Sequence, residues 1–208
     1  MVTQATQLRF DSARRDWAKR VLRIGGIIQV SFAGFWLVRG SLALGGPLGT
    51  ALASALLATA LAVLVYGVTA TAGLTPRPRG SDAARLERAL TIATIIQLAA
   101  SFVAPLVVIK LDRADLVLPS IAITIGPLLL WLGHRLCIPR FRWVGWAPIV
   151  APVLVALVIN GSMLSAVVGI GAGALLITTA TIGFRQLAHD PALHVARQHR
   201  RAANPAPL

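Results

Sequence analysis

The chain has 208 residues, of which 56% are hydrophobic and only 13% are charged. A soluble domain averages about 45–50% apolar and about 25% charged residues, whereas a disordered chain combines low hydrophobicity with many charges. The composition excludes both classes. It predicts an all-α, polytopic membrane protein that folds as a compact bundle of helices joined by short loops.

The net charge of the chain is strongly positive, at +13 from 20 Lys and Arg against 7 Asp and Glu. In a soluble protein this balance would indicate a nucleic-acid partner. Here the charges lie between long apolar runs, so we expect no nucleic-acid binding. We expect the basic segments to set the orientation in the bilayer and to contact anionic lipid headgroups.

The first segment, residues 1–22, is basic and is expected to lie on the cytoplasmic membrane surface. Docking of a cytoplasmic partner is the alternative role. A bilayer core of about 30 Å needs about 20 helical residues, and this length divides the apolar part of the chain into six spans. The expected transmembrane helices are 24–38, 48–74, 89–109, 116–132, 146–159 and 163–184. A basic cytoplasmic tail, 185–208, completes the single membrane domain.

The last two spans come from one uncharged stretch, 146–184. As a single helix this stretch would be about 58 Å long, roughly twice the thickness of the hydrocarbon core. The cluster Asn160-Gly161-Ser162 is typical of a turn and terminates helices. We therefore expect two antiparallel helices that meet at Asn160.

The basic residues alternate between the two sides of this six-span arrangement. Seventeen of the twenty Lys and Arg residues fall on the side that holds both termini, and the other three are Arg39, Lys110 and Arg113. The positive-inside rule then places both termini in the cytoplasm. A bacterial inner membrane is the expected location. A cleaved signal sequence ending near Ala43 is the alternative, and it would leave five spans.

The predicted spans contain no acidic residue, because all seven acids lie in loops or tails. This argues against a proton-coupled antiporter with an intramembrane carboxylate and against a cation pore with an acidic ring. It leaves open the transport of neutral or lipid-like molecules.

Two amides are the most polar groups inside the predicted bundle. Gln29 and Gln97 stand in similar apolar strings, each about eight residues into a span that runs outward from the cytoplasm. Parallel helices would place both amides at similar depth, where an unpaired amide costs several kcal/mol. Two hypotheses follow: the amides are packing residues bonded between helices, or they line a substrate-binding pocket between the first and third spans.

Small residues predict close helix packing. Gly169 and Gly173 form a GxxxG spacing in the last span, and such faces let two helices approach closely. The spacing fits packing inside the bundle, and it also fits a homo-oligomer or a membrane partner. We interpret Gly169 and Gly173 as helix-packing residues within the bundle.

Catalytic signatures are missing from the chain. No HExxH, GxSxG or P-loop is present, and His134 and Cys137 have no carboxylate nearby in sequence. We therefore expect no catalytic residues, no metal site and no cofactor. The first hypothesis is a structural, accessory or partner-binding membrane protein. The alternative is a small transport subunit or permease for a neutral or apolar molecule, and a membrane-embedded enzyme comes third.

Overall fold

The structure of the protein is a computed structural model that describes residues 16–72 and 81–190. Within these ranges the chain folds into six α-helices and two short helical segments of other types, which confirms the all-α prediction. The elements are η1 (Val21–Gly25, π-helical), α2 (Gly26–Leu42), α3 (Gly46–Ala70), α4 (Ser81–Lys110), η2 (Ala114–Leu116, 3₁₀), α5 (Val117–Arg135), α6 (Pro139–Ala156) and α7 (Gly161–Ala188).

Five helical stretches are long and apolar enough to cross a bilayer. They are Asp16–Leu42, Gly46–Ala70, Ala83–Lys110, Ala114–Arg135 and Gly161–Ala188. Each spans at least the roughly 20 residues that the hydrocarbon core requires. The chain is therefore a multi-pass membrane protein, and these helices contact the lipid bilayer.

Helix α6, which corresponds to the fifth predicted span, departs clearly from its predicted range. The expected span was 146–159, whereas α6 covers Pro139–Ala156 and is not among the five long apolar stretches. It begins early because Ile138 is extended and Pro139 takes the first helical position, where its missing N–H costs nothing. The early start brings Arg140 and Arg142 into its first turn, which lowers its hydropathy. Six membrane crossings, and the side on which the termini lie, remain predictions.

The turn between α6 and α7 lies where the sequence indicated one. Asn160 is extended and precedes α7, and Gly161 has a positive φ of 67°. The left-handed conformation carries no steric penalty for glycine, which explains why the reversal occurs here. The first transmembrane helix is longer than its predicted range of 24–38, because it continues as a π-helical segment back to the helical turn that begins at Asp16.

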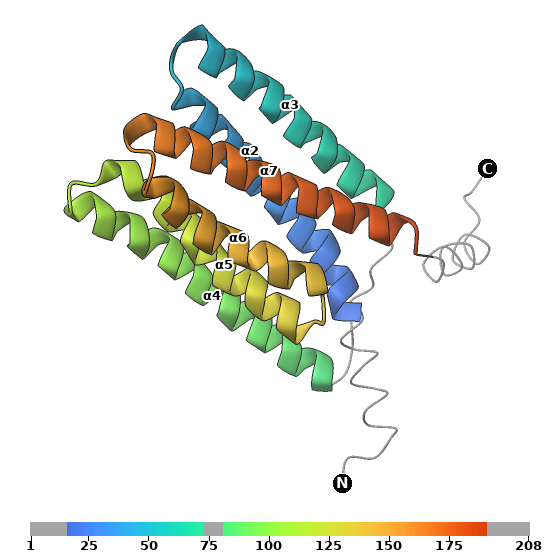
Figure 1. The fold of residues 1–208 in the computed structure, drawn as a ribbon. Helices are drawn as coiled ribbons and strands as arrows, with labels where there is room; N and C mark the ends of the chain where they lie inside the picture. Colours follow the sequence, from blue (N-terminus) through green and yellow to red (C-terminus); the bar gives the residue numbers. More distant parts are fainter. Residues whose placement is uncertain (1–15, 73–80, 191–208) are drawn as a thin grey trace.

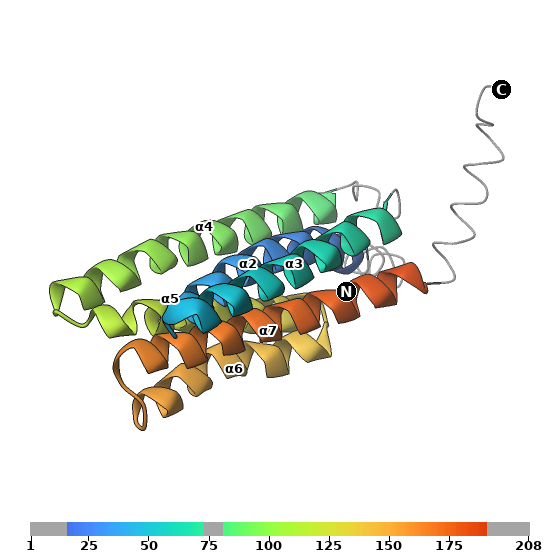
Figure 2. The same ribbon diagram turned by 90° about the horizontal axis from the view of Figure 1, so that it is seen from above.

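The helices run alternately up and down in two groups (Figures 1 and 2). In one group α2 packs against both α3 and α7, and in the other α5 packs against both α4 and α6. The groups meet where α5 and α6 contact α7. The starts of α2 and α4, the ends of α3 and α7, and the turn between α5 and α6 gather at one end of the bundle (Figure 1).

Close packing within each group depends on glycine. Across the α5–α6 interface, a Cβ on Gly126 would lie 2.6 Å from the carbonyl oxygen of Gly145. In the first group the ring of Phe184 is fully buried between α2 and α3, where a Cβ on Gly26 or Gly67 would collide with it. Helices in a membrane associate through such van der Waals contact, since lipid supplies no hydrophobic drive between them.

Candidate functional site

A cavity of about 300 Å³ lies between α2 and α4, the two helices that face each other across the groups. We call it the α2–α4 groove. Its sides are formed by α2, the preceding segment 17–25 and α4, with contributions from α5 and from Leu176 of α7. Its volume is at the lower limit of the range for small-molecule sites, about 300–1,000 Å³. The lining residues are Trp17, Arg20, Val21, Ile24, Gly25, Ile28, Gln29, Phe32, Leu90, Thr94, Gln97, Leu98, Ser101, Ile121, Ile125, Leu128, Leu129, Leu132 and Leu176.

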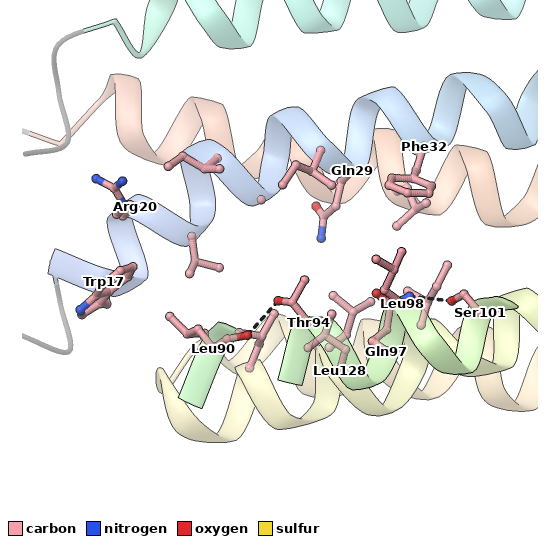
Figure 3. Close-up of a pocket in the computed structure, with 18 of the residues that line it drawn as sticks. Trp17, Arg20, Gln29, Phe32, Leu90, Thr94, Gln97, Leu98, Ser101 and Leu128 are labelled. Atoms are coloured by element: carbon pink, nitrogen blue, oxygen red, sulfur yellow. Dashed lines mark hydrogen bonds between the residues drawn. The ribbon is translucent and has the colours of Figure 1, made fainter. Parts of the chain in front are cut away.

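Both glutamines singled out in the sequence line this groove. Gln29 comes from α2 and Gln97 from α4, and each side chain is half-buried. Figure 3 shows the Gln29 amide directed across the gap towards α4, while the Gln97 amide lies along α4. The structure therefore brings together two residues that are 68 positions apart in sequence.

The Gln97 amide takes part in a chain of hydrogen bonds that links α4 to α5. Its Nε2 donates to Oγ of Ser101 at 2.9 Å, and Ser101 Oγ lies 2.7 Å from Oγ1 of Thr124 on α5. Thr124 Oγ1 in turn lies 2.7 Å from the carbonyl oxygen of Ile121. Sequence reasoning missed Ser101, although its i,i+4 spacing from Gln97 was the signal that could have found it.

The Gln29 amide has a different environment. Within residues 16–72 and 81–190 it has no hydrogen-bond partner, and neither does Oε1 of Gln97. Thr94, the third polar side chain that α4 contributes to the groove, donates to the carbonyl oxygen of Leu90 at 2.8 Å. Three amide atoms, Oε1 and Nε2 of Gln29 and Oε1 of Gln97, are thus free to bond a molecule in the groove.

Arg20 lies at one end of the groove and is the only charged residue among the described positions that line it. Trp17 is 6% exposed there, and the guanidinium carbon of Arg20 lies 5.7 Å from the centroid of its ring. Figure 3 shows the Arg20 guanidinium turned away from α4. The placement of the Arg20 guanidinium against the ring of Trp17 is a cation–π contact. The middle of the groove, where the glutamines lie, is therefore uncharged.

The rims of the groove are apolar and exposed. Ile28 and Phe32 on α2 are each 50% exposed, and Leu98 on α4 is 48% exposed. These side chains project from helices long enough to span a membrane, so they face lipid rather than water. The groove thus opens sideways towards the hydrocarbon region.

The other residues considered in the sequence lie away from the groove. Gly169 and Gly173 of α7 lie against α2, where a Cβ on Gly173 would meet Leu37 at 2.5 Å. His134 and Cys137 are exposed near the α5–α6 turn. In the part of the chain that the structure describes, no three His, Cys, Asp or Glu residues are grouped as metal ligands would be.

Comparison with known proteins gave no match. No protein-family model, curated protein or solved structure is similar to the chain at a significant level. The chemistry of the groove must therefore be argued from its own residues. Apolar walls, the unpaired Gln29 amide, the partly paired Gln97 amide and an uncharged centre are suited to binding an apolar molecule that carries a polar group.

Proposed function

We propose that the protein binds a neutral, largely apolar small molecule in the α2–α4 groove and acts as a small transport or carrier subunit for it. The observation that carries this proposal is the position of Gln29 and Gln97. They come from different helices, line one cavity, and keep hydrogen-bonding groups unsatisfied inside an apolar wall. An amide left without a partner in such surroundings costs free energy, which a bound polar group would recover.

The lateral opening supports the same proposal. Ile28, Phe32 and Leu98 expose apolar surface at the rims, so a molecule dissolved in the bilayer can reach the groove without crossing water. The bundle offers no carboxylate in the groove lining, which fits a neutral cargo better than a cation. The proposed setting is a bacterial inner membrane with both termini cytoplasmic.

The second candidate function is a structural or accessory role, in which the amides only hold helices together. The contact that favours it is the Ser101–Thr124 bond, which already engages Gln97 in helix packing. In that case the groove would hold only bulk lipid, and Gln29 would bond transiently to whatever occupies it. A partner protein or a second copy of the chain would then be the main ligand.

The test is to extract the full-length protein with its surrounding lipid and quantify the small molecules that copurify. We expect one compound at near-stoichiometric amount with the wild type, and a loss of most of it in the double variant Gln29→Leu/Gln97→Leu. Matched controls are Ser31→Ala on α2 and Thr91→Val on α4. Both remove an exposed hydroxyl that bonds only to its own helix, outside the groove.

The two functions give different results in this experiment. Retention of the compound by both control variants and its loss from the double variant supports a binding function at the groove. Recovery of the same lipid mixture from all four proteins would contradict it and favour the structural role.

A further inference from the structure

The amide atoms that lack a hydrogen-bond partner in the groove restrict the kind of ligand group that can bond to them. One hydrogen of Gln97 Nε2 is donated to Ser101, and Oε1 of the same amide has no hydrogen-bond partner in the described chain. Gln29 presents both a donor and an acceptor, since neither of its amide atoms has a partner in the described chain. A group that satisfies Oε1 of Gln97 must donate a hydrogen bond, and the same group can accept one from Gln29.

A hydroxyl meets this requirement, because one oxygen both donates and accepts a hydrogen bond. A ketone or ether oxygen only accepts, and it would leave Oε1 of Gln97 unsatisfied. An ionised carboxylate or phosphate also only accepts. It would in addition bring a charge to the centre of the groove, where no basic side chain lines the wall and Arg20 faces away from α4.

The rest of the lining sets the shape of the remaining part of the ligand. Leucine and isoleucine side chains of α5, including Ile125 and Leu128, form the floor between α2 and α4. Phe32 and Leu98 form exposed rims beyond the glutamines. A hydrocarbon chain that lies along these side chains keeps its carbon atoms in apolar contact throughout.

We propose that the α2–α4 groove binds a single-chain lipid alcohol, which enters sideways from the bilayer. Its hydroxyl donates to Oε1 of Gln97 and accepts from Nε2 of Gln29, and its hydrocarbon chain lies on the α5 floor. This assignment rests on the proposed binding function and names the chemical class of the molecule bound.

The experiment uses three photoreactive probes that share one diazirine-bearing hydrocarbon chain and differ only in the terminal group. The groups are a primary alcohol, its methyl ether and a carboxylic acid. The full-length protein is placed in phosphatidylcholine nanodiscs, irradiated with each probe, and digested to locate labelled peptides by mass spectrometry. We expect the alcohol to label peptides of α2, α4 and α5 about threefold to tenfold more than the ether, the effect of one neutral hydrogen bond.

Variants then test the two amides separately. We expect Gln97→Met to remove the preference for alcohol over ether, because methionine fills a similar volume without an acceptor. We expect Gln29→Met to weaken labelling by the alcohol and by the ether alike, because both oxygens accept from Nε2. Thr91→Val should change neither quantity. The ratio of alcohol to ether labelling in the wild type needs no variant, so it tests the assignment even where a substitution impairs folding.

The remaining outcomes separate this assignment from the proposed function. Equal labelling of the groove by alcohol and ether would overturn recognition of a hydroxyl and leave the binding function supported. Strongest labelling by the acid would overturn recognition of a hydroxyl and indicate a charged headgroup near Arg20. Labelling spread evenly over all lipid-facing helices with every probe would contradict both the lipid-alcohol assignment and the proposed function.

Discussion

Gly40 of α2 and Gly169 of α7 bring the backbones of the two helices into direct contact. A Cβ on Gly169 would lie 2.7 Å from Cα of Gly40, and a Cβ on Gly40 would lie 2.7 Å from the backbone nitrogen of Ile170. Backbone atoms cannot move aside as the end of a flexible side chain can. Both positions therefore accept only glycine at this separation of the helices, and the α2–α7 interface depends on them.

Substitution of Gly169 should separate these helices. We expect Gly169→Val to lower the free energy of unfolding by about 1–3 kcal/mol, the usual cost of an overpacked interface, or more where the backbone cannot relax. Unfolding in mixed detergent micelles measures it. Gly171→Ala is the matched control on the same helix, because a Cβ at Gly171 meets nothing within 4 Å. Equal stability of both variants would show that the close approach contributes nothing.

Removal of the Phe184 ring should destabilise the contact of α7 with α2 and α3. The ring is 0% exposed and fills the slot beside Gly26 and Gly67. We expect Phe184→Ala to cost about 3–5 kcal/mol on the scale of buried aromatic truncations. Phe102→Ala, at a position 66% exposed on α4, should leave the thermal midpoint in detergent almost unchanged. A small loss in Phe184→Ala would mean that lipid or neighbouring helices refill the slot.

The Ser101–Thr124 bond should couple α4 to α5 in a double-mutant cycle. Their oxygens are 2.7 Å apart, and hydrogen bonds between membrane helices contribute about 0.6 kcal/mol on average. We expect Ser101→Ala and Thr124→Val to show a coupling free energy of about this size in unfolding measurements. Thr91→Val with Thr124→Val should show none, because Thr91 bonds only to Glu87 of its own helix. Additive losses at Ser101 and Thr124 would deny the link.

Thiol labelling can test the predicted orientation in the membrane. Cys137 is the single cysteine and is exposed at the α5–α6 turn, the end at which we expect the cytoplasm. A membrane-impermeant maleimide should label it in inverted vesicles and not in intact cells. Ser162→Cys in a Cys137→Ala background lies in the opposite turn and should give the reverse pattern. Labelling of Cys137 in intact cells would overturn the orientation with both termini inside.

The sequence by itself determined the class of the protein and the nature of its elements. Composition predicts a helical membrane protein, and the long uncharged stretch broken at Asn160 predicts the turn that the structure places before Gly161. These properties are local, because they depend on the hydropathy of a segment and on the conformations that its turn residues allow. Helix ends were less accurate. The start of α6 at Pro139 depends on the chain leaving the turn at Ile138 in an extended conformation.

Only the tertiary structure decided which helix faces pack against one another. The sequence singled out Gln29 and Gln97 as amides in apolar strings and offered a pocket between their two spans as one hypothesis. It gave no partner helix for Gly169 and Gly173, because small residues are frequent in most spans and give no partner a clear advantage. The fold places both glycines against α2 and leaves α2 and α4 apart, with Gln29 and Gln97 on either side of the groove. The positions of these residues follow from how closely the glycine-bearing helices α2 and α7 pack. The closeness of that packing depends on the shapes of all six helices at once.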